Sequence, residues 1–238
     1  MTDIAVRQAI EAVPVEEFIG LAQSLASLPL PAAMQQLTQF AVDHLGGADA
    51  AGLTVTTANG LATVAATSDL STRVDALQYA FGGPCVEALT GADPIQHVTN
   101  VATDPRWRPF ARAALDQTPV RGVLSCRLSV ADDPPIACLN LYATRNNAFT
   151  PGMIRAVGLY GAQAGLVLAY LQQRDKARSL AGAIDSNRRI GAAIGILMSR
   201  RRLTQDQAFS LLRRASQNSN RKLRDIADEV LHHGDIPR

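Results

Sequence analysis

The sequence predicts an α+β protein with an antiparallel sheet flanked by helices, a long connecting helix and a C-terminal three-helix bundle. Two pairs of strand-like runs alternate with helix-like segments, an order that places helices on the faces of an antiparallel sheet. Apolar residues at three-then-four spacing from Thr150 onward predict the long helix. Two short amphipathic segments that follow it complete the bundle.

The first pair of strands spans residues 50–57 and 61–67 and surrounds Asn59-Gly60. Both central residues of a type I′ turn need a positive φ, which Asn and Gly adopt readily. The dipeptide therefore predicts a tight hairpin.

The second pair spans residues 122–130 and 136–143, with Asp132-Asp133-Pro134-Pro135 between them. Proline cannot donate a backbone N–H to a central ladder, so these prolines predict a turn. The other predicted elements are helices at residues 3–28, 32–45, 71–81, 85–89 and 106–115 and a strand at 95–98.

The long helix has a clear predicted start and an interruption. Thr150 suits the N-cap and Pro151 suits the first helical position. The apolar stripe lapses over residues 172–178, which are mostly polar, and we interpret this lapse as the domain junction. The predicted domains are therefore residues 13–171 and 172–238.

Beyond the junction the apolar stripe resumes in a new frame, in which Asn187 falls on the apolar seam. This seam predicts a coiled-coil contact between two copies, because a single Asn in such a seam sets the register. The alternative is an amphipathic helix that packs on its own domain. The seam residues are Leu180, Ala183, Ile190, Ile194 and Leu197.

Two further helices close the chain. Thr204 and Gln207 have the spacing of a capping box, which predicts a helix start. Asn220 is predicted to cap the last helix, and Gly234 and Pro237 are predicted to end it. A unit of three such helices is small, so a partner chain or the long helix should help to stabilise it.

Charge is distributed unevenly along the chain. Residues 1–171 carry 9 Arg and no Lys against 14 Asp and Glu, a net charge of −5. Residues 172–238 carry 12 Arg and 2 Lys against 7 Asp and Glu, a net charge of +7. This asymmetry predicts a polyanionic partner for the basic part, and the alternative is that the two domains attract each other. The excess of arginine favours phosphate, because a guanidinium binds phosphate through two parallel hydrogen bonds and stacks on bases.

The sequence does not predict an enzyme, a metal site or a cofactor. The cysteines form no CxxC pair, and the histidines fall in no metal-binding or nucleophile motif. The cysteines are expected to be reduced and packed in the core. These residues are Cys85, Cys126, Cys138, His44, His97, His232 and His233.

A cytoplasmic location is expected. No uninterrupted apolar run reaches the roughly 18 residues that span a bilayer. The first ten residues also lack the basic-then-apolar order of a signal peptide.

Residues 190–198, IGAAIGILM, resemble the core of the ANTAR domain, an RNA-binding antitermination module. The resemblance covers residues 176–232 and continues through Leu203–Arg213 and Asn220–Ala227. It implies a three-helix bundle at the end of a coiled coil. It also implies that a dimer binds paired hairpins in nascent RNA and thereby disfavours a terminator.

The resemblance to ANTAR domains also implies an RNA-binding face. Its predicted residues are Arg188, Arg189, Gly195, Arg200, Arg201, Arg213, Arg214, Arg221 and Lys222. Two alternatives remain open from the residues alone. Three short basic helices also suit a helix-turn-helix that binds DNA, and a basic face also suits an acidic protein partner.

The first part of the chain, residues 30–170, resembles a GAF sensor domain of the kind that precedes ANTAR modules in actinobacteria. The matching residues lie in Gly83–Leu89, Asp104–Phe110 and Cys138–Tyr142. The resemblance implies an unknown small-molecule or protein input. Cys85 is a candidate redox residue, because a thiol near a helix N-terminus can have a lowered pKa, and the alternative is a packed thiol.

Overall fold

The computed structural model describes residues 15–129 and 137–236, and its contacts divide the chain into two units, Met1–Gln173 and Arg174–Arg238. The predicted boundary at residue 171 stays a prediction. The first unit contains α2 (Val15–Ser27), α3 (Leu30–Leu45), β1 (Ala50–Thr57), β2 (Gly60–Ala66), α4 (Asp69–Phe81), α5 (Pro84–Thr90), β3 (Ile95–Val98), α6 (Arg108–Gln117), β4 (Gly122–Leu128) and β5 (Ala137–Ala143). Helix α7 (Pro151–Arg201) runs from the first unit into the second, which adds α8 (Gln205–Ser219) and α9 (Leu223–His233).

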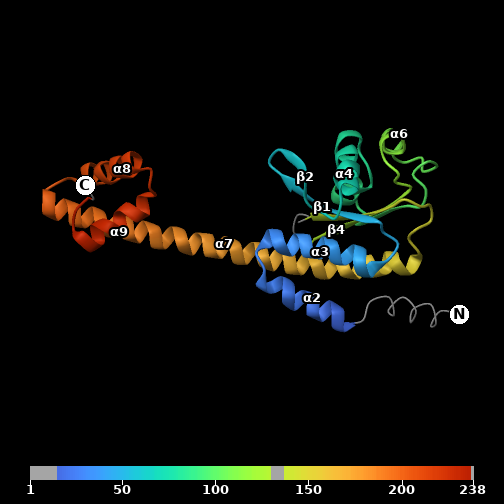
Figure 1. Ribbon diagram of the computed structural model, residues 1–238, viewed down its shortest axis with the longest axis horizontal. Helices are drawn as coiled ribbons and strands as arrows, with labels where there is room; N and C mark the ends of the chain where they lie inside the picture. The colour runs from blue at the N-terminus through green and yellow to red at the C-terminus, as the bar shows by residue number, and fades with distance from the viewer. Residues whose placement is uncertain (1–14, 130–136, 237–238) are drawn as a thin grey trace. The chain divides into compact units, whose positions relative to one another are not determined.

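The five strands form one antiparallel sheet in the order β2-β1-β5-β4-β3. Helix α3 and the first part of α7 cover one face of this sheet, and α4 and α6 cover the other (Figure 1). The predicted α+β class and the antiparallel sheet are therefore confirmed. The predicted turn at residues 132–135 lies outside the described residues.

The β1–β2 hairpin is confirmed, but its predicted turn type is wrong. Gly60 has a φ of 109° and pairs with Thr57, so the connecting residues are Ala58 and Asn59. Asn59 is not among the described residues with a positive φ. The Thr57 hydroxyl accepts from the Asn59 N–H at 3.2 Å and donates to the Gly60 carbonyl at 2.8 Å. These two bonds stabilise a turn that needs only one positive φ, and Gly60 supplies it.

Strand β5 shows how the two faces of the sheet differ. All seven of its residues are buried, and they alternate between the faces because successive side chains of a strand point in opposite directions. Leu139 and Leu141 join the apolar cluster formed with α2, α3 and α7. Cys138, Asn140 and Tyr142 point to the side of α4 and α5. One layer of the interior is therefore hydrocarbon, and the other contains polar groups.

Helix α7 begins as predicted. It starts at Pro151, and the Thr150 hydroxyl accepts from the Met153 N–H at 3.3 Å. Its buried residues in the first unit include Val157, Tyr160 and Leu171, which belong to the predicted apolar stripe.

Two glycines bring α7 close to the sheet. A Cβ added at Gly161 would lie 2.6 Å from Cys126 Sγ and 3.2 Å from Leu128 Cδ2. A Cβ added at Gly165 would lie 3.0 Å from the Ser129 carbonyl oxygen. Gly161 therefore needs a residue without a side chain, because real Cβ atoms do not approach other atoms so closely, and a Cβ at Gly165 would require the backbone of Ser129 to shift.

One window of α7 is apolar enough to resemble a membrane span by length and composition alone, with a mean hydropathy of 1.3 and 39% of the window buried. The buried core helix of a soluble protein passes the same test. Tyr160 and Leu168 of α7 lie in the core of the first unit, where they pack on the sheet and on α3. This packing accounts for the buried part of the apolar window.

We expect Gly161→Ala to lower the free energy of unfolding by about 1–3 kcal/mol, because the added methyl group overpacks the contact with β4. In contrast, Gly182→Ala should raise it by about 0.5–1 kcal/mol. A Cβ at Gly182 meets nothing within 4 Å, and alanine loses less conformational entropy in a helix than glycine does. Urea denaturation of both variants checks the pair, and equal effects would contradict the close packing of α7 on the sheet.

Candidate nucleic-acid interface

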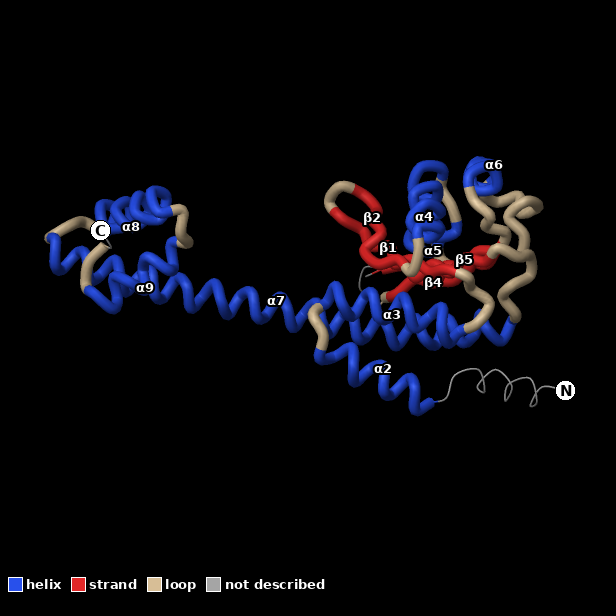
Figure 2. Tube along the Cα trace, viewed as in Figure 1, coloured by secondary structure: helices blue, strands red, loops and turns tan. Residues whose placement is uncertain are grey.

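The C-terminal unit is a three-helix module built from the last turns of α7 and from α8 and α9 (Figure 2). Its core contains seven buried apolar residues, to which each of the three helices contributes. They are Ala193, Leu197, Ala208, Leu212, Ile226, Ala227 and Val230. The predicted apolar faces of all three helices therefore meet in one small core.

The ends of α8 match the predictions only in part. The capping box is confirmed, because the Thr204 hydroxyl accepts from the Gln207 N–H at 3.3 Å and Gln207 Oε1 accepts from the Thr204 N–H at 2.9 Å. Asn220 was predicted to cap the last helix, which is wrong. Asn220 instead ends α8 with φ 52° and ψ 37°, a left-handed conformation that Asn tolerates, and Lys222 is the N-cap of α9.

The predicted coiled-coil seam divides between two environments. Leu180 is 63% exposed, whereas Leu197 is fully buried in the core of its own module. Ile190 and Ile194 also pack against that core. For this last part of the helix the prediction of a dimer contact is therefore wrong, and packing within the chain is the correct alternative.

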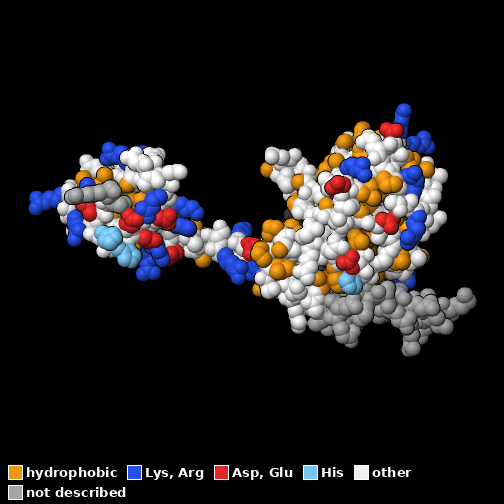
Figure 3. Space-filling view, in the orientation of Figure 1, with side chains coloured by type: hydrophobic (Ala, Val, Ile, Leu, Met, Phe, Trp, Pro, Cys, Tyr) orange, Lys and Arg blue, Asp and Glu red, His pale blue; other side chains and the backbone are white. Residues whose placement is uncertain are grey.

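The basic side chains of the module lie on its outside, and acidic side chains lie among them (Figure 3). Arg189 contacts Asp185 at 2.9 Å and Asp228 at 3.0 Å, Arg201 contacts Asp235 at 2.7 Å, and Arg221 contacts Glu229 at 2.5 Å. Asp228 and Glu229 lie on α9, and Asp235 lies just after it.

These ion pairs tie α9 and the residues after it to α7 and to the turn before α9. Arg200 adds a weaker link, because its guanidinium donates to the His233 carbonyl at 3.4 Å. Four of the predicted RNA-binding arginines therefore already have a partner within the module.

The other predicted cations form a separate group, which we name the free cations: Arg188, Arg213, Arg214 and Lys222. All four are exposed, and the described residues contain no ion pair of any of them. A cation without an internal partner can bind an external anion without first breaking a salt bridge. The free cations are therefore the best placed of the predicted residues to contact phosphate.

Gly195 is also exposed, and a Cβ added there would meet no atom within 4 Å. Packing inside the module therefore does not explain the glycine. A glycine at an exposed helix position allows the backbone of a ligand to approach closely.

A network of polar side chains fills the side of the first unit that faces α4 and α5. Asp75 is fully buried and accepts hydrogen bonds from the Tyr142 hydroxyl, from Thr63 Oγ1 at 2.8 Å and from Asn140 Nδ2 at 3.0 Å. A Cβ at Gly52 would collide with the Asp75 carboxylate, so this position of β1 requires glycine. No ion pair of Asp75 occurs within residues 15–129 and 137–236.

Burial raises the pKa of Asp75 to about 6, although the three hydrogen bonds from Tyr142, Thr63 and Asn140 oppose this shift. An uncompensated buried charge is costly, and the protonated form avoids that cost.

Cys85 lies at the edge of this network and is fully buried, with its N–H donating to Gln78 Oε1 at 2.7 Å. A hydrogen bond with the Cys138 thiol lowers the pKa of Cys85, and burial opposes this effect. The expected burial of the thiols is therefore correct for all three cysteines. A redox role for Cys85 stays a prediction.

Family models match both units of the chain. The model of the GAF domain matches residues 27–169, and the model of the ANTAR domain matches residues 178–231. The chain belongs to the GAF domain family. Its C-terminal unit is an ANTAR domain, so the predicted order of a GAF domain followed by an ANTAR domain is confirmed. No curated protein sequence matches the chain significantly.

Solved structures support the GAF fold. A bacteriophytochrome from R. palustris is 11% identical, with a TM-score of 0.56, over 83% of this chain and 46% of that chain. The GAF domain of an Acinetobacter phosphoenolpyruvate-protein phosphotransferase is 12% identical, with a TM-score of 0.52, over 67% and 94%. A free methionine-R-sulfoxide reductase from Neisseria meningitidis, solved with its substrate, is 13% identical, with a TM-score of 0.51, over 65% and 87%. At these identities the likeness shows the fold and not the chemistry.

GAF and ANTAR domains are regulatory, and no group of three or more His, Cys, Asp or Glu side chains within the described part of the chain is arranged to hold a metal. The absence of an enzymatic activity stays a prediction.

Base stacking was predicted for guanidinium groups, and Phe209 was not among the predicted RNA-binding residues. Phe209 is 39% exposed on α8, one turn before Arg213, among the basic side chains. An exposed aromatic ring beside a guanidinium is a stacking surface for an unpaired base. Phe209 is the only aromatic residue in the last 67 residues, which was a signal, but its exposure depends on how α8 rotates against the core.

We expect the Asp75 carboxyl to make the stability of the GAF domain depend on pH. Its protonated form is favoured in the fold, so its contribution is complete below the unfolded pKa near 3.8 and is lost as the pH rises through about 6. This loss amounts to about 3 kcal/mol, and Asp75→Asn should remove it.

Urea denaturation of the parent and of Asp75→Asn between pH 4 and pH 7.5 measures the difference. Asp69→Asn, at an exposed position of the same helix, is the matched control and should keep the parental pH dependence. An unchanged pH dependence in Asp75→Asn would show that the carboxyl is solvated in solution.

Proposed function

We propose that this chain is a signal-responsive transcription regulator that binds paired hairpins of nascent RNA through its ANTAR domain and controls transcription termination. The GAF domain receives a small-molecule or protein signal, and the protein acts in the cytoplasm as a homodimer. The observation that best supports RNA binding is the group of free cations on the ANTAR surface. An exposed surface with several unpaired guanidinium groups attracts a polyphosphate chain strongly, because each contact releases condensed counterions.

The exposed ring of Phe209 favours RNA loops over duplex DNA and over an acidic protein, and Gly195 is compatible with each of these ligands. Phe209 offers a ring face, which can stack only on a base that is not already stacked within a duplex. Gly195 leaves room for a backbone to approach. The alternative functions, a DNA-binding or protein-interaction regulator, would not need the exposed aromatic ring.

Binding of a hairpin RNA to the full-length protein should weaken steeply with salt, and Arg213→Gln should reduce the logarithmic salt slope by about one unit. The reason is that this substitution removes one phosphate contact from an exposed residue that has no structural ion pair. Fluorescence anisotropy with a labelled hairpin over a range of salt concentrations measures the slope.

Arg112→Gln, at an exposed arginine of the GAF domain, is the matched control and should leave the slope unchanged. The same assay with duplex DNA and with an acidic peptide as competitors separates the alternatives. Displacement of the RNA by duplex DNA at equal nucleotide concentration would contradict the proposal.

The exposed face of α7 supports the proposal of a homodimer. Five large apolar side chains of this helix are between 57% and 67% exposed, and they fall on one alternating four-then-three repeat. They are Leu159, Leu166, Tyr170, Leu180 and Ile184.

The same repeat passes through Gln163, Gln173, Ala177 and Asn187, so it has the heptad spacing of a coiled coil with polar positions that set the register. A second copy of the same helix presents a complementary apolar stripe. This seam keeps Leu180 and Asn187 of the predicted one and replaces its other members.

Ile184→Asp should convert the dimer to a monomer, because it places a carboxylate at an apolar position of the proposed seam. Its affinity for two linked hairpins should fall towards that for a single hairpin, since two linked binding modules gain from effective concentration. Sedimentation velocity and anisotropy measure the two effects.

Ser179→Asp adds the same charge to an exposed position outside the repeat and should remain dimeric. A parent protein that sediments as a monomer at micromolar concentration would refute the dimer and leave RNA binding by a single module open.

A further inference from the structure

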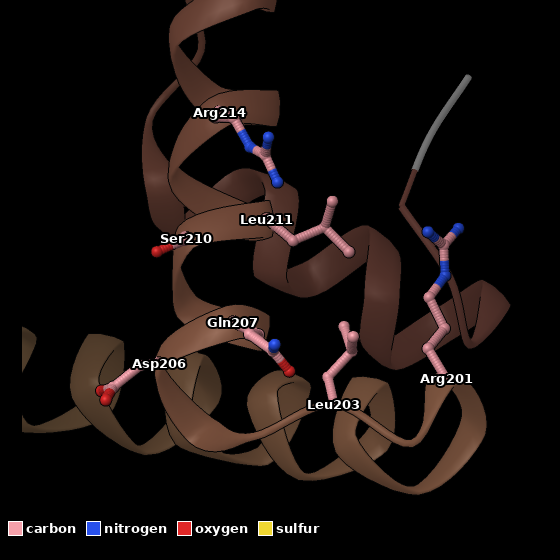
Figure 4. Close-up of a pocket in the computed structure, with 7 residues that line it drawn as sticks. All are labelled: Arg201, Leu203, Asp206, Gln207, Ser210, Leu211 and Arg214. Carbon is pink, nitrogen blue, oxygen red and sulfur yellow. The ribbon is translucent and has the colours of Figure 1, made fainter.

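A groove lies on one side of α8 in the ANTAR domain, between this helix and the end of α7. It has a volume of about 450 Å³. Figure 4 shows Leu203 and Leu211 between Arg201 on one side and Gln207 and Arg214 on the other, whereas Asp206 and Ser210 point away from this gap. The groove thus has a short apolar floor between two guanidinium groups, and Asp206 and Ser210 complete its lining at the edge.

The apolar floor is the feature that binding of phosphate does not explain. Leu203 and Leu211 pack against the module's core on one side and remain partly exposed in the groove on the other. A phosphate gains nothing from leucine side chains, whereas the flat face of a nucleobase buries apolar surface on them. A nucleotide carries both a base and a phosphate, and so it complements the leucines together with the arginines.

The polar groups at the walls suit the edge of a base. The Arg201 guanidinium is held in place by Asp235 at 2.7 Å, whereas Arg214 is one of the free cations. Gln207 uses its Oε1 atom in the capping box, which fixes the position of the side-chain amide. No hydrogen bond of its Nε2 atom occurs within the described chain, so this nitrogen can donate to a base. The groove therefore presents a paired guanidinium, an amide fixed by the capping box and a cation without an ion pair in the described chain.

We propose that this groove binds one unpaired base from the loop of an RNA hairpin, an inference that rests on the proposed RNA binding. The base lies over Leu203 and Leu211, the Gln207 amide donates to its edge, and Arg214 neutralises an adjacent phosphate. The groove then determines which loops bind, because its walls contact a base. Arg213 lies outside the groove and contributes only to affinity for phosphate.

The test uses the full-length protein and a hairpin that the protein itself selects from a pool with a randomised loop. Each loop base is then removed in turn to leave an abasic nucleotide. Removal of the base that occupies the groove should weaken binding by about tenfold or more, and removal of the others should have smaller effects.

Leu203→Trp places a large side chain in the groove and should lower the affinity for the intact hairpin to about that of the parent for the critical abasic hairpin. Removal of the same base should then have no further effect in this variant. Arg214→Ala, which leaves the apolar floor intact, is a second variant in case Leu203→Trp unfolds, as circular dichroism would show. In Arg214→Ala the effect of removing the critical base should shrink, because a nucleotide whose phosphate is no longer held beside the groove places its base in the groove less often.

Arg213→Gln is the matched control, because Arg213 is exposed on the same helix but does not line the groove, and its effect should multiply with that of the abasic substitution. If Leu203→Trp and Arg214→Ala both respond to every abasic substitution as strongly as the parent does, the groove holds no base and the inference is wrong, although RNA binding stands. If Leu203→Trp changes the sedimentation of the protein, the groove holds a second copy, which also overturns the inference. If no hairpin from the pool binds the parent, the proposed function itself fails.

Discussion

The burial of one helix in two cores is the constraint on which the rest of this structure depends. Val157, Tyr160 and Leu168 of α7 pack into the GAF core, and Ala193 and Leu197 of the same helix pack into the ANTAR core. The ANTAR domain has too few residues to bury a large core, so the last turns of α7 serve as one of the three helices that enclose it. Each core buries one face of α7. The large apolar side chains from Leu159 to Ile184 lie outside these buried faces and form one heptad repeat, so the proposed dimer seam lies on this helix.

The basic residues of the ANTAR domain have two separate roles, which their count alone does not reveal. Arginines that pair with Asp228, Glu229 and Asp235 hold the last helix and the residues after it against the rest of the module. The free cations make no such contacts and remain available to an external anion. A small module with a core of only seven buried apolar residues needs surface links of the first kind. Binding of a polyanion needs the second kind, because an arginine that already has a carboxylate partner must give it up to bind phosphate.

The interior of the GAF domain holds a polar network where an apolar core would be expected. Strand β5 alternates leucines on one face with Cys138, Asn140 and Tyr142 on the other. Asn140 and Tyr142 donate hydrogen bonds to the carboxylate of Asp75, and the Cys138 thiol donates to Asn140 Oδ1. Such a network specifies one arrangement of the helices against the sheet, since each donor requires its acceptor in place. It also holds a buried carboxyl group whose pKa burial raises to about 6. Burial and hydrogen bonding act on this carboxyl in opposite directions, so small changes in the packing of α4 would shift its protonation.

Local patterns determined much of the architecture in advance. The capping box at Thr204, the helix start at Thr150-Pro151 and the hairpin around Asn59-Gly60 were predictable because they depend on residues near one another in the chain. The motifs in residues 190–227 pointed to an ANTAR domain for the same reason, and the charge asymmetry pointed to a polyanionic partner. Only the tertiary structure decided which face of each helix is buried. It turned Ile190 and Leu197 inward, left Phe209 and Ile184 exposed, and brought Asp228 to Arg189. Sequence spacing gives the period of a helix but not its rotation, and that rotation depends on contacts between residues far apart in the chain.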